Sequence, residues 1–288
     1  LVMRFLAIIS LPVIVLFAVW ISPAASSGWQ VSEISGLTAH LYKPLSDPGL
    51  QGKRALMVSL HGCAQPAITM RNYGNWESAA DRYGMVVVVP ELPGVGINYR
   101  CWDASADARA VESPHYKLLL TMISELMADN ELNIDPKQVY ISGFGSGGST
   151  AQALACLAPH TFAGLGLSSA PLLGTQPGKS GAMNTDLGRA VADCRALAQD
   201  QIGAFDSQVT SVVFGDSDPI LPESQIMLTQ QLFSTIYRAY TMKSEVSGNE
   251  KIKGNRWVDQ SGQTRLSLVE VDGLGHAWPS GARSRTAL

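Results

Sequence analysis

The chain has 288 residues, of which 46% are hydrophobic, and a formal net charge of -3. This length and apolar content suffice for one sizeable α/β core. The mildly acidic balance, without a run of Lys and Arg, argues against nucleic acid or an anionic membrane surface as a partner. We therefore expect a single folded domain that acts on a small molecule or a polymer.

The first 26 residues look like an export signal rather than part of the fold. Met3 and Arg4 precede an uncharged apolar run at 5–21, and small residues follow at 23–27. This pattern predicts cleavage within about Ala24 to Ser26, with an uncleaved N-terminal anchor as the alternative. We expect residues 27–288 to form one secreted or periplasmic domain without stable membrane association after cleavage. The sequence leaves open whether this domain is truncated at its C-terminus. A membrane-tethered interaction module is the minor alternative.

Four cysteines are present, at positions 63, 101, 156 and 194. An extracytoplasmic compartment is oxidising, so disulfides are expected, and four cysteines allow three pairings. Proximity along the sequence favours Cys63 with Cys101 and Cys156 with Cys194. A structural zinc site is the competing interpretation, but neither C-x-x-C nor H-x-x-x-H spacing occurs. We expect no metal and no cofactor.

Strand-like apolar runs alternate with helical periodicities along the chain. An opening hairpin is predicted at 29–42, helices at 76–83, 116–127, 149–157, 186–198 and 222–237, and later strands at 55–60, 85–90, 138–142, 162–168, 210–214 and 265–271. Such alternation predicts right-handed crossovers and a mainly parallel central sheet with helices on both faces.

The segment 139–150, V-Y-I-S-G-F-G-S-G-G-S-T, carries a strand through small residues into a helix. An α/β-hydrolase presents its nucleophile on such an elbow, which needs the pattern Gly-x-Ser-x-Gly. Here the central position is Gly145, and Ser146 follows it. Ser146 can be the nucleophile only if the turn shifts by one residue, which puts Phe144 where a small side chain is needed. Otherwise Ser146 is a first-turn helix residue and the nucleophile is absent.

The acid and the base of a catalytic triad are expected after later strands, in the order nucleophile, acid, histidine. Asp218, in G-D-S-D-P, is the candidate acid, whereas Asp216 suits a turn residue that bonds the local backbone. His276, in G-L-G-H-A-W-P, is the candidate base. Structural roles are expected for the other four histidines, His40, His61, His115 and His160.

The loop after the strand at 55–60 begins with His-Gly, as oxyanion loops of this fold do. We expect His61 to shape this loop, and the backbone amide of Cys63 or Ala64 to face the substrate. Trp102 and Trp278 lie next to the predicted loops and are candidates to line an acyl or polymer groove.

Several motifs in fixed order resemble the secreted polyhydroxybutyrate depolymerase family, which includes related feruloyl and acetylxylan esterases. They are L-H-G-C-A-Q, N-W-E-S-A-A-D-R-Y-G-M-V-V-V-V-P-E, C-W-D, V-Y-I-S-G-x-x-x-G-G, G-D-S-D-P-I-L-P and G-L-G-H-A-W-P, over about residues 37–279. The resemblance implies Asp218 and His276 as acid and base, a disulfide between Cys63 and Cys101 near the site, and the oxyanion loop at Cys63. The family serine falls on Gly145.

Two functions follow from this pattern. The first is a secreted carboxylic ester hydrolase with a Ser-His-Asp acyl-enzyme mechanism, with Ser146 as provisional nucleophile. The second is a hydrolase-fold protein without its nucleophile, which binds ester or polyester ligands with little or no turnover. In both, the ligand is expected to be a polyhydroxyalkanoate or an acylated polysaccharide.

Overall fold

The computed structural model describes residues 28–49, 51–94, 100–107, 109–175, 185–245 and 250–279. The predicted export segment at 1–26 lies outside the described residues. Within them, no helix has both the length and the apolar character needed to cross a membrane.

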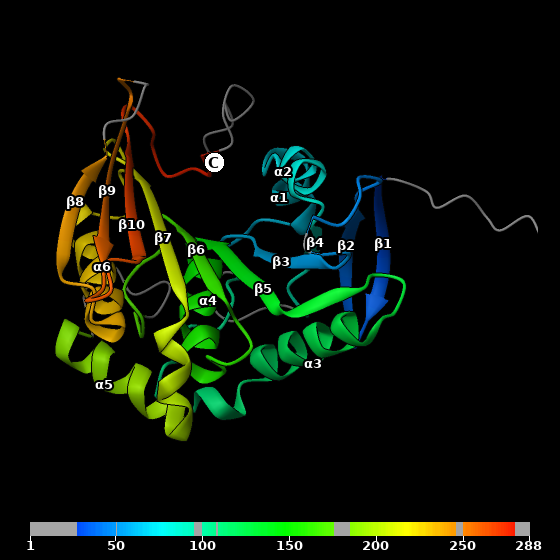
Figure 1. The fold of residues 1–288 in the computed structure, drawn as a ribbon, viewed down its shortest axis with the longest axis horizontal. Helices are drawn as coiled ribbons and strands as arrows, with labels where there is room; N and C mark the ends of the chain where they lie inside the picture. The colour runs from blue at the N-terminus through cyan, green and yellow to red at the C-terminus, as the bar shows by residue number, and fades with distance from the viewer. Residues whose placement is uncertain are drawn as a thin grey trace, which may run out of the picture.

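A ten-stranded sheet runs through the molecule in the order β1-β2-β4-β3-β5-β6-β7-β10-β9-β8 (Figure 1). Neighbouring strands from β4 across to β10 are parallel, and the strands at both ends pair antiparallel. The strands are β1 (Gly28–Ile34), β2 (Leu37–Lys43), β3 (Arg54–Leu60), β4 (Val86–Pro90), β5 (Ile134–Phe144), β6 (Gly164–Ser168), β7 (Val209–Gly215), β8 (Thr241–Glu245), β9 (Ile252–Val258) and β10 (Thr264–Val271).

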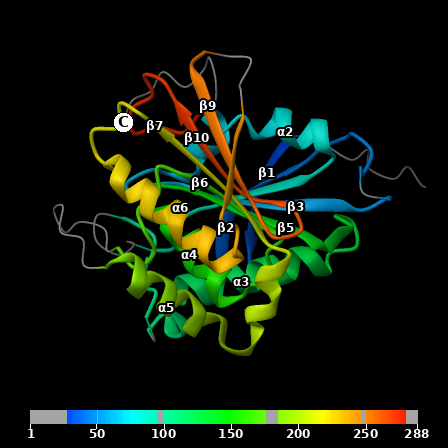
Figure 2. The ribbon, with the colours of Figure 1, turned by 60° about the vertical axis from the view of Figure 1, so that its left-hand side comes forward.

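Helices cover both sides of this sheet (Figure 2). Helix α2 lies on one side, where α1 and α2 pack on β2 and β4, and α3 to α6 lie on the other. The helices are α1 (Ala67–Tyr73), α2 (Trp76–Tyr83), α3 (Pro114–Ala128), α4 (Ser146–Leu157), α5 (Leu187–Ala198) and α6 (Glu223–Tyr237), with 3₁₀ turns η1 (Ala110–Glu112) and η2 (Gln199–Asp206). The predicted α/β-hydrolase architecture is confirmed.

The central strands form where the sequence is apolar without interruption. All five residues of β4, V-V-V-V-P, are buried, as expected for a parallel strand covered on both faces. Helix α2 buries Trp76 and Ala80 on one face. It ends at Gly84, the predicted C-cap, which has a φ of 62° and whose backbone N–H donates a hydrogen bond to the Ala80 carbonyl.

Helix α1 and the strands β8 and β9 were not predicted. β9 is only partly buried along most of its length, so its apolar pattern is weak. The turn between β9 and β10 did carry a signal in the sequence, because it reads Asp-Gln-Ser-Gly from position 259. In the structure Asp259 accepts the amides of Ser261 and Gln263 at 2.9 and 3.1 Å. Asp at the start of a Gly-containing turn is typical of a hairpin.

Two disulfides are present, and they join the expected pairs. Cys156 of α4 bonds Cys194 of α5, with both residues fully buried, and Cys63 bonds Cys101. Each bridge spans a sequence separation of 38 residues. The first fastens two helices on one side of the sheet, and the second joins two loops.

Replacing Cys156 and Cys194 together by Ala is expected to lower the free energy of unfolding by about 4 kcal/mol, because the unfolded chain regains the entropy of a long loop. Equilibrium unfolding in urea measures this loss. The matched control replaces Cys63 and Cys101, whose loop is equally long and whose loss should be similar. A loss below about 1 kcal/mol for the helix pair would contradict the prediction.

Candidate active site

The elbow at the end of β5 is centred on Gly145. Its backbone angles are φ 53° and ψ -118°, in the left-handed half of conformational space that disfavours side chains. The Gly145 amide donates to the Ser168 carbonyl at 3.1 Å, and the Gly145 carbonyl accepts the Gly148 amide at 3.0 Å as α4 begins. Gly145 therefore occupies the sharp, strained position from which this fold presents its nucleophile.

The glycines around Gly145 are required by packing, whereas Gly145 is not. A Cβ atom on Gly143 would lie 2.2 Å from the carbonyl carbon of Gly147, and one on Gly147 would lie 2.5 Å from the Leu60 carbonyl oxygen. Beyond its two chain neighbours, a Cβ atom on Gly145 would meet one atom of the described part of the chain within 4 Å, Nε2 of His276 at 3.6 Å. The position has room for a side chain, and that side chain would face the imidazole.

His276 and Asp218, the expected base and acid, lie in direct contact. Nδ1 of His276 lies 2.8 Å from Oδ2 of Asp218, while Oδ1 of Asp218 accepts the amides of Ile220 and Leu221 at 2.9 Å each. Burial by itself would raise the pKa of Asp218, but the Leu221 amide, His276 and the Ile220 amide together hold that pKa below its usual range. An ionised Asp218 fixes the ring proton of His276 on Nδ1 and leaves Nε2 as the free base.

The loops that carry the pair are locked to each other. Oδ1 of Asp216 accepts the Gly273 amide at 2.8 Å, and the Ser217 amide donates to the Leu274 carbonyl at 3.1 Å. A Cβ atom on Gly215 would lie 1.8 Å from the Leu274 carbonyl oxygen, so only glycine fits there. The Asp216 carboxylate thus bonds the distant Gly273 amide instead of the local backbone that the sequence interpretation expected, and it holds the acid loop against the histidine loop.

Aromatic contacts hold the histidine loop in place. The Phe144 ring lies 4.7 Å from the His276 ring, and the Trp278 ring lies 5.6 Å from that of Trp76 in α2. Nε1 of Trp278 also donates to the Gly74 carbonyl at 3.3 Å. Trp278 is therefore an anchor of the loop beside the site, and only its partly exposed remainder is left to contact a ligand.

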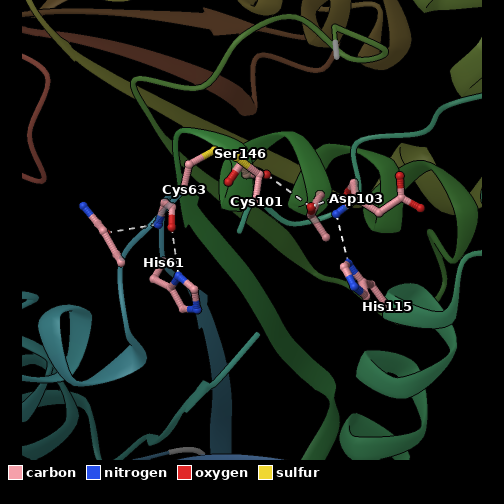
Figure 3. The surroundings of a disulfide bond; sticks show 9 residues. His61, Cys63, Cys101, Asp103, His115 and Ser146 are labelled. Atoms are coloured by element: carbon pink, nitrogen blue, oxygen red, sulfur yellow. Dashed lines mark hydrogen bonds between the residues drawn. A yellow bond between two sulfur atoms is a disulfide. The ribbon is translucent and has the colours of Figure 1, made fainter. Parts of the chain in front are cut away.

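No hydrogen bond joins the Ser146 hydroxyl to the His276 imidazole in the described structure. It is the first residue of α4 and 6% exposed, and its Oγ has no hydrogen-bond partner among the described residues. The one-residue shift that a Ser146 nucleophile requires does not occur, because the backbone contacts of Gly143 and Gly147 fix the turn on Gly145. Figure 3 shows Ser146 in the surroundings of the nearby disulfide.

The oxyanion loop differs in one respect from the expectation. The amide of Ala64 donates to the Arg100 carbonyl at 3.2 Å, so it is already engaged, and the expected donor role of Ala64 is wrong. The amide of Cys63, an exposed residue, stays a candidate. The sequence interpretation missed the amide of Ser146, which has no intrahelical acceptor at the start of α4. Its place directly after the elbow position was the signal, since that residue supplies an oxyanion donor in this fold.

Trp102 does not line a groove. It is fully buried, with its ring centroid 5.3 Å from that of His61 and 5.8 Å from that of His115. The expectation that it contacts substrate is therefore wrong, because no part of the side chain is exposed.

The other histidines have structural contacts, and burial lowers the pKa of both His61 and His115. Nδ1 of His61 lies 2.9 Å from the Gly62 carbonyl, and Nδ1 of His115 accepts the Asp103 amide at 3.0 Å. His40 pairs with Glu91, and His160 contacts Gln201, as the sequence interpretation expected of residues outside the catalytic site.

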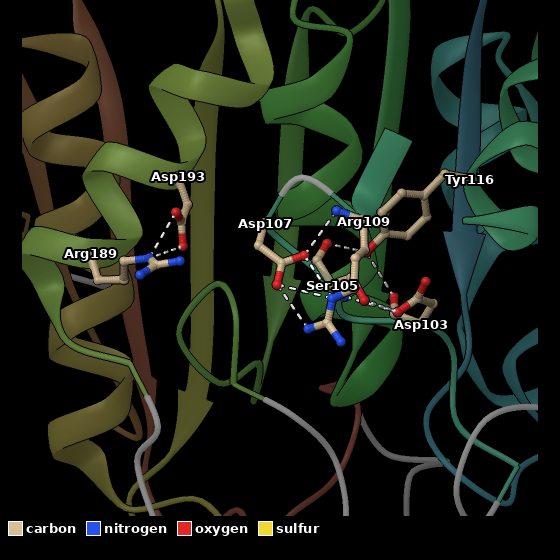
Figure 4. A network of polar contacts seen from close by, with 7 residues as sticks. All are labelled: Asp103, Ser105, Asp107, Arg109, Tyr116, Arg189 and Asp193. Carbon is tan, nitrogen blue, oxygen red and sulfur yellow. Dashed lines mark hydrogen bonds and ion pairs between the residues drawn. The ribbon is translucent and has the colours of Figure 1, made fainter. Parts of the chain in front are cut away.

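A buried network below the site was not foreseen. Oγ1 of Thr150, in α4, donates to the Asp103 carbonyl at 2.6 Å. The Tyr116 hydroxyl donates to the same carbonyl at 3.0 Å (Figure 4). Together with the disulfide from Cys101 to Cys63, these bonds tie the loop that holds Cys101 and Asp103 to α4, to α3 and to the oxyanion loop. Long-range contacts of this kind leave no local signal in a sequence.

No cluster of three or more His, Cys, Asp or Glu side chains suited to a metal ion occurs in the described ranges.

The lowered pKa of Asp218 predicts a pH-dependent contribution to stability. A carboxylate whose pKa is depressed on folding stabilises the protein above its unfolded value of about 3.9, and this contribution is lost as the pH falls through the folded value. Asp218→Asn should therefore lower the free energy of unfolding at pH 7, with a difference from the unmodified chain that shrinks below pH 4. Urea unfolding at both pH values measures it; a difference independent of pH would contradict the assignment.

Known proteins match this sequence and fold. Residues 37–263 match the family model "Esterase PHB depolymerase". A poly(3-hydroxybutyrate) depolymerase of Ralstonia pickettii is 32% identical over 265 residues, covering 88% of this chain and 54% of the relative. Acetylxylan esterase A of Emericella nidulans is 22% identical over 250 residues, covering 82% of this chain and 79% of the relative. The chain thus spans about half the length of the Ralstonia protein.

Among solved structures, the acetyl xylan esterase from Aspergillus awamori superimposes with a TM-score of 0.70 at 16% identity, over 87% of this chain and 94% of that one. At this identity the likeness concerns the fold, which is that of α/β-hydrolase esterases. The family model and the Ralstonia relative each match most of the chain. This chain therefore belongs to the esterase PHB depolymerase family of carboxylic ester hydrolases.

Proposed function

We propose that this chain is an ester-binding member of its family that has lost the acyl-enzyme nucleophile. The observation that carries the proposal is Gly145 at the tip of the elbow, where a Cβ atom would lie 3.6 Å from Nε2 of His276. At this position a hydroxyl would complete a Ser-His-Asp triad, and the chain supplies only a hydrogen atom. Ester ligands bind, and no acyl-enzyme forms.

The rest of the apparatus for ester chemistry is present. Asp218 and His276 form a proton-accepting pair, and the amides of Ser146 and Cys63 are the proposed oxyanion donors. Such donors act on the ligand without help from the nucleophile, so binding and polarisation of an ester carbonyl survive its loss. Turnover by the acyl-enzyme route does not.

The ligand class is an ester of a polyhydroxyalkanoate or of an acylated polysaccharide. This assignment is supported by the relatives named poly(3-hydroxybutyrate) depolymerase and acetylxylan esterase. We further propose one hydrolase domain over residues 27–288, exported to an oxidising compartment by the preceding segment. Two disulfides, at Cys63–Cys101 and Cys156–Cys194, support that location.

A second candidate is the serine esterase that uses Ser146. It is favoured by one observation, the buried Oγ of Ser146 without a hydrogen-bond partner among the described residues. It requires the elbow to rearrange by one residue on ligand binding, against the close backbone contacts of Gly143 and Gly147.

Gly145→Ser is expected to raise hydrolysis of 4-nitrophenyl butyrate by at least about 10³-fold, because it restores the group whose loss costs a triad most of its rate. A fluorophosphonate should then label position 145, as mass spectrometry of the digested protein would show. The same change should lower the free energy of unfolding by about 1 to 3 kcal/mol, since a side chain is strained at a φ of 53°.

Gly145→Ala is the matched control, because it carries the same backbone strain without the hydroxyl. It should lose stability to the same degree and gain no labelling. If Gly145→Ser left activity flat while Ser146→Ala abolished it in the unmodified chain, the second candidate would replace the first.

A further inference from the structure

We propose that the His276–Asp218 pair hydrolyses carboxylic esters directly, by activating a water molecule in the space that a side chain at position 145 would fill. This inference rests on the proposed loss of the nucleophile and goes beyond it. It assigns to the unmodified chain a slow hydrolysis in one chemical stage, with no covalent intermediate.

Among the described residues, the space beside the imidazole is open. The Cβ position on Gly145 lies 3.6 Å from Nε2 of His276, and no other atom of the described residues lies within 4 Å once the two chain neighbours are set aside. The Cβ position itself is beyond hydrogen-bond range of Nε2, so a water oxygen that is displaced from it toward the imidazole, away from the Gly145 backbone, comes within hydrogen-bond reach of Nε2, about 3 Å. It takes the position of a serine Oγ, next to the Ser146 amide that opens α4.

The imidazole is prepared to accept a proton. Asp218, itself held by the Ile220 and Leu221 amides, keeps the ring proton on Nδ1, so Nε2 offers its lone pair to the water. The Phe144 ring, 4.7 Å away, packs on the imidazole and keeps Nε2 aimed at the space above Gly145. The base is therefore ordered before any ligand arrives.

The reaction balances without a further reactant. The water oxygen bonds to the ester carbonyl carbon while Nε2 of His276 takes one of its protons, and the carbonyl π electrons move onto oxygen. The amides of Ser146 and Cys63 stabilise this oxyanion. When the C=O bond reforms, the bond to the alcohol oxygen breaks and that oxygen takes the proton from His276. The products are the carboxylic acid and the alcohol.

Dependence on histidine separates this reaction from background catalysis. In a triad that has lost its nucleophile, the residual rate ordinarily comes from the oxyanion donors and from binding, and removal of the histidine costs little more. General-base assistance contributes about 10² to 10⁴-fold. A large loss on removal of His276 is thus specific to the proposed reaction.

The experiment measures hydrolysis of 4-nitrophenyl butyrate by the full chain and its variants, with thermal unfolding of each variant as a check of folding. His276→Gln should lower the rate about 10²-fold, and Gly145→Ala should do so as well, because its methyl group occupies the place of the water. His160→Gln, which alters an exposed histidine, is the matched control and should leave the rate unchanged. Progress curves should be linear from the start, and intact mass spectra should show no acyl adduct.

The outcomes separate this inference from the proposed function. If His276→Gln or Gly145→Ala leaves the rate unchanged, or the unmodified chain does not exceed buffer while Gly145→Ser is active, the inference is overturned and the lost nucleophile stands. If Gly145→Ser is inactive, the proposed function fails. An initial burst with an adduct on Ser146 of the unmodified chain would overturn both.

Discussion

The close passage of β5 into α4 is the constraint on which the site depends. The backbones at Gly143 and Gly147 approach so closely that a Cβ atom on either would overlap main-chain atoms. This contact leaves one register for the turn and places position 145 at its tip. The site is thereby fixed by main-chain packing, which does not depend on whether the tip carries a hydroxyl.

Glycine at the tip relieves a strain that a nucleophile would impose. A φ of 53° costs a residue with a side chain of the order of 1 to 3 kcal/mol, and Gly145 avoids that cost. Active sites commonly hold such strain as part of their mechanism. In this chain the strain is absent, yet the Asp218–His276 pair and the locked loops around it are kept. The arrangement suits a site in which the base still acts on something other than a protein hydroxyl.

Support for the site comes from several directions around the elbow. The Cys63–Cys101 bridge joins the oxyanion loop to a second loop, whose Asp103 carbonyl accepts Thr150 of the elbow helix. On the other side, Trp278 fastens the histidine loop to Trp76 of α2 and to Gly74 at the end of α1. The second loop is tied to α4 and α3 and the histidine loop to α2, so movement of either loop would break these contacts. This rigidity keeps an imidazole oriented where no serine holds it.

The sequence by itself determined the fold class and the order of the central elements, because apolar periodicity and motif order are read along the chain. It also favoured the disulfide pairs that the structure contains, and it named Asp218 and His276 as the candidate acid and base. It left open whether position 145 or 146 lies at the elbow tip, and it misassigned Trp102 and Ala64. Those questions depend on contacts between distant segments: the backbone of β3 against α4, the Arg100 carbonyl against the oxyanion loop, and the histidines that bury an indole. Only the tertiary structure brings these atoms together, and it places Gly145 opposite Nε2 of His276.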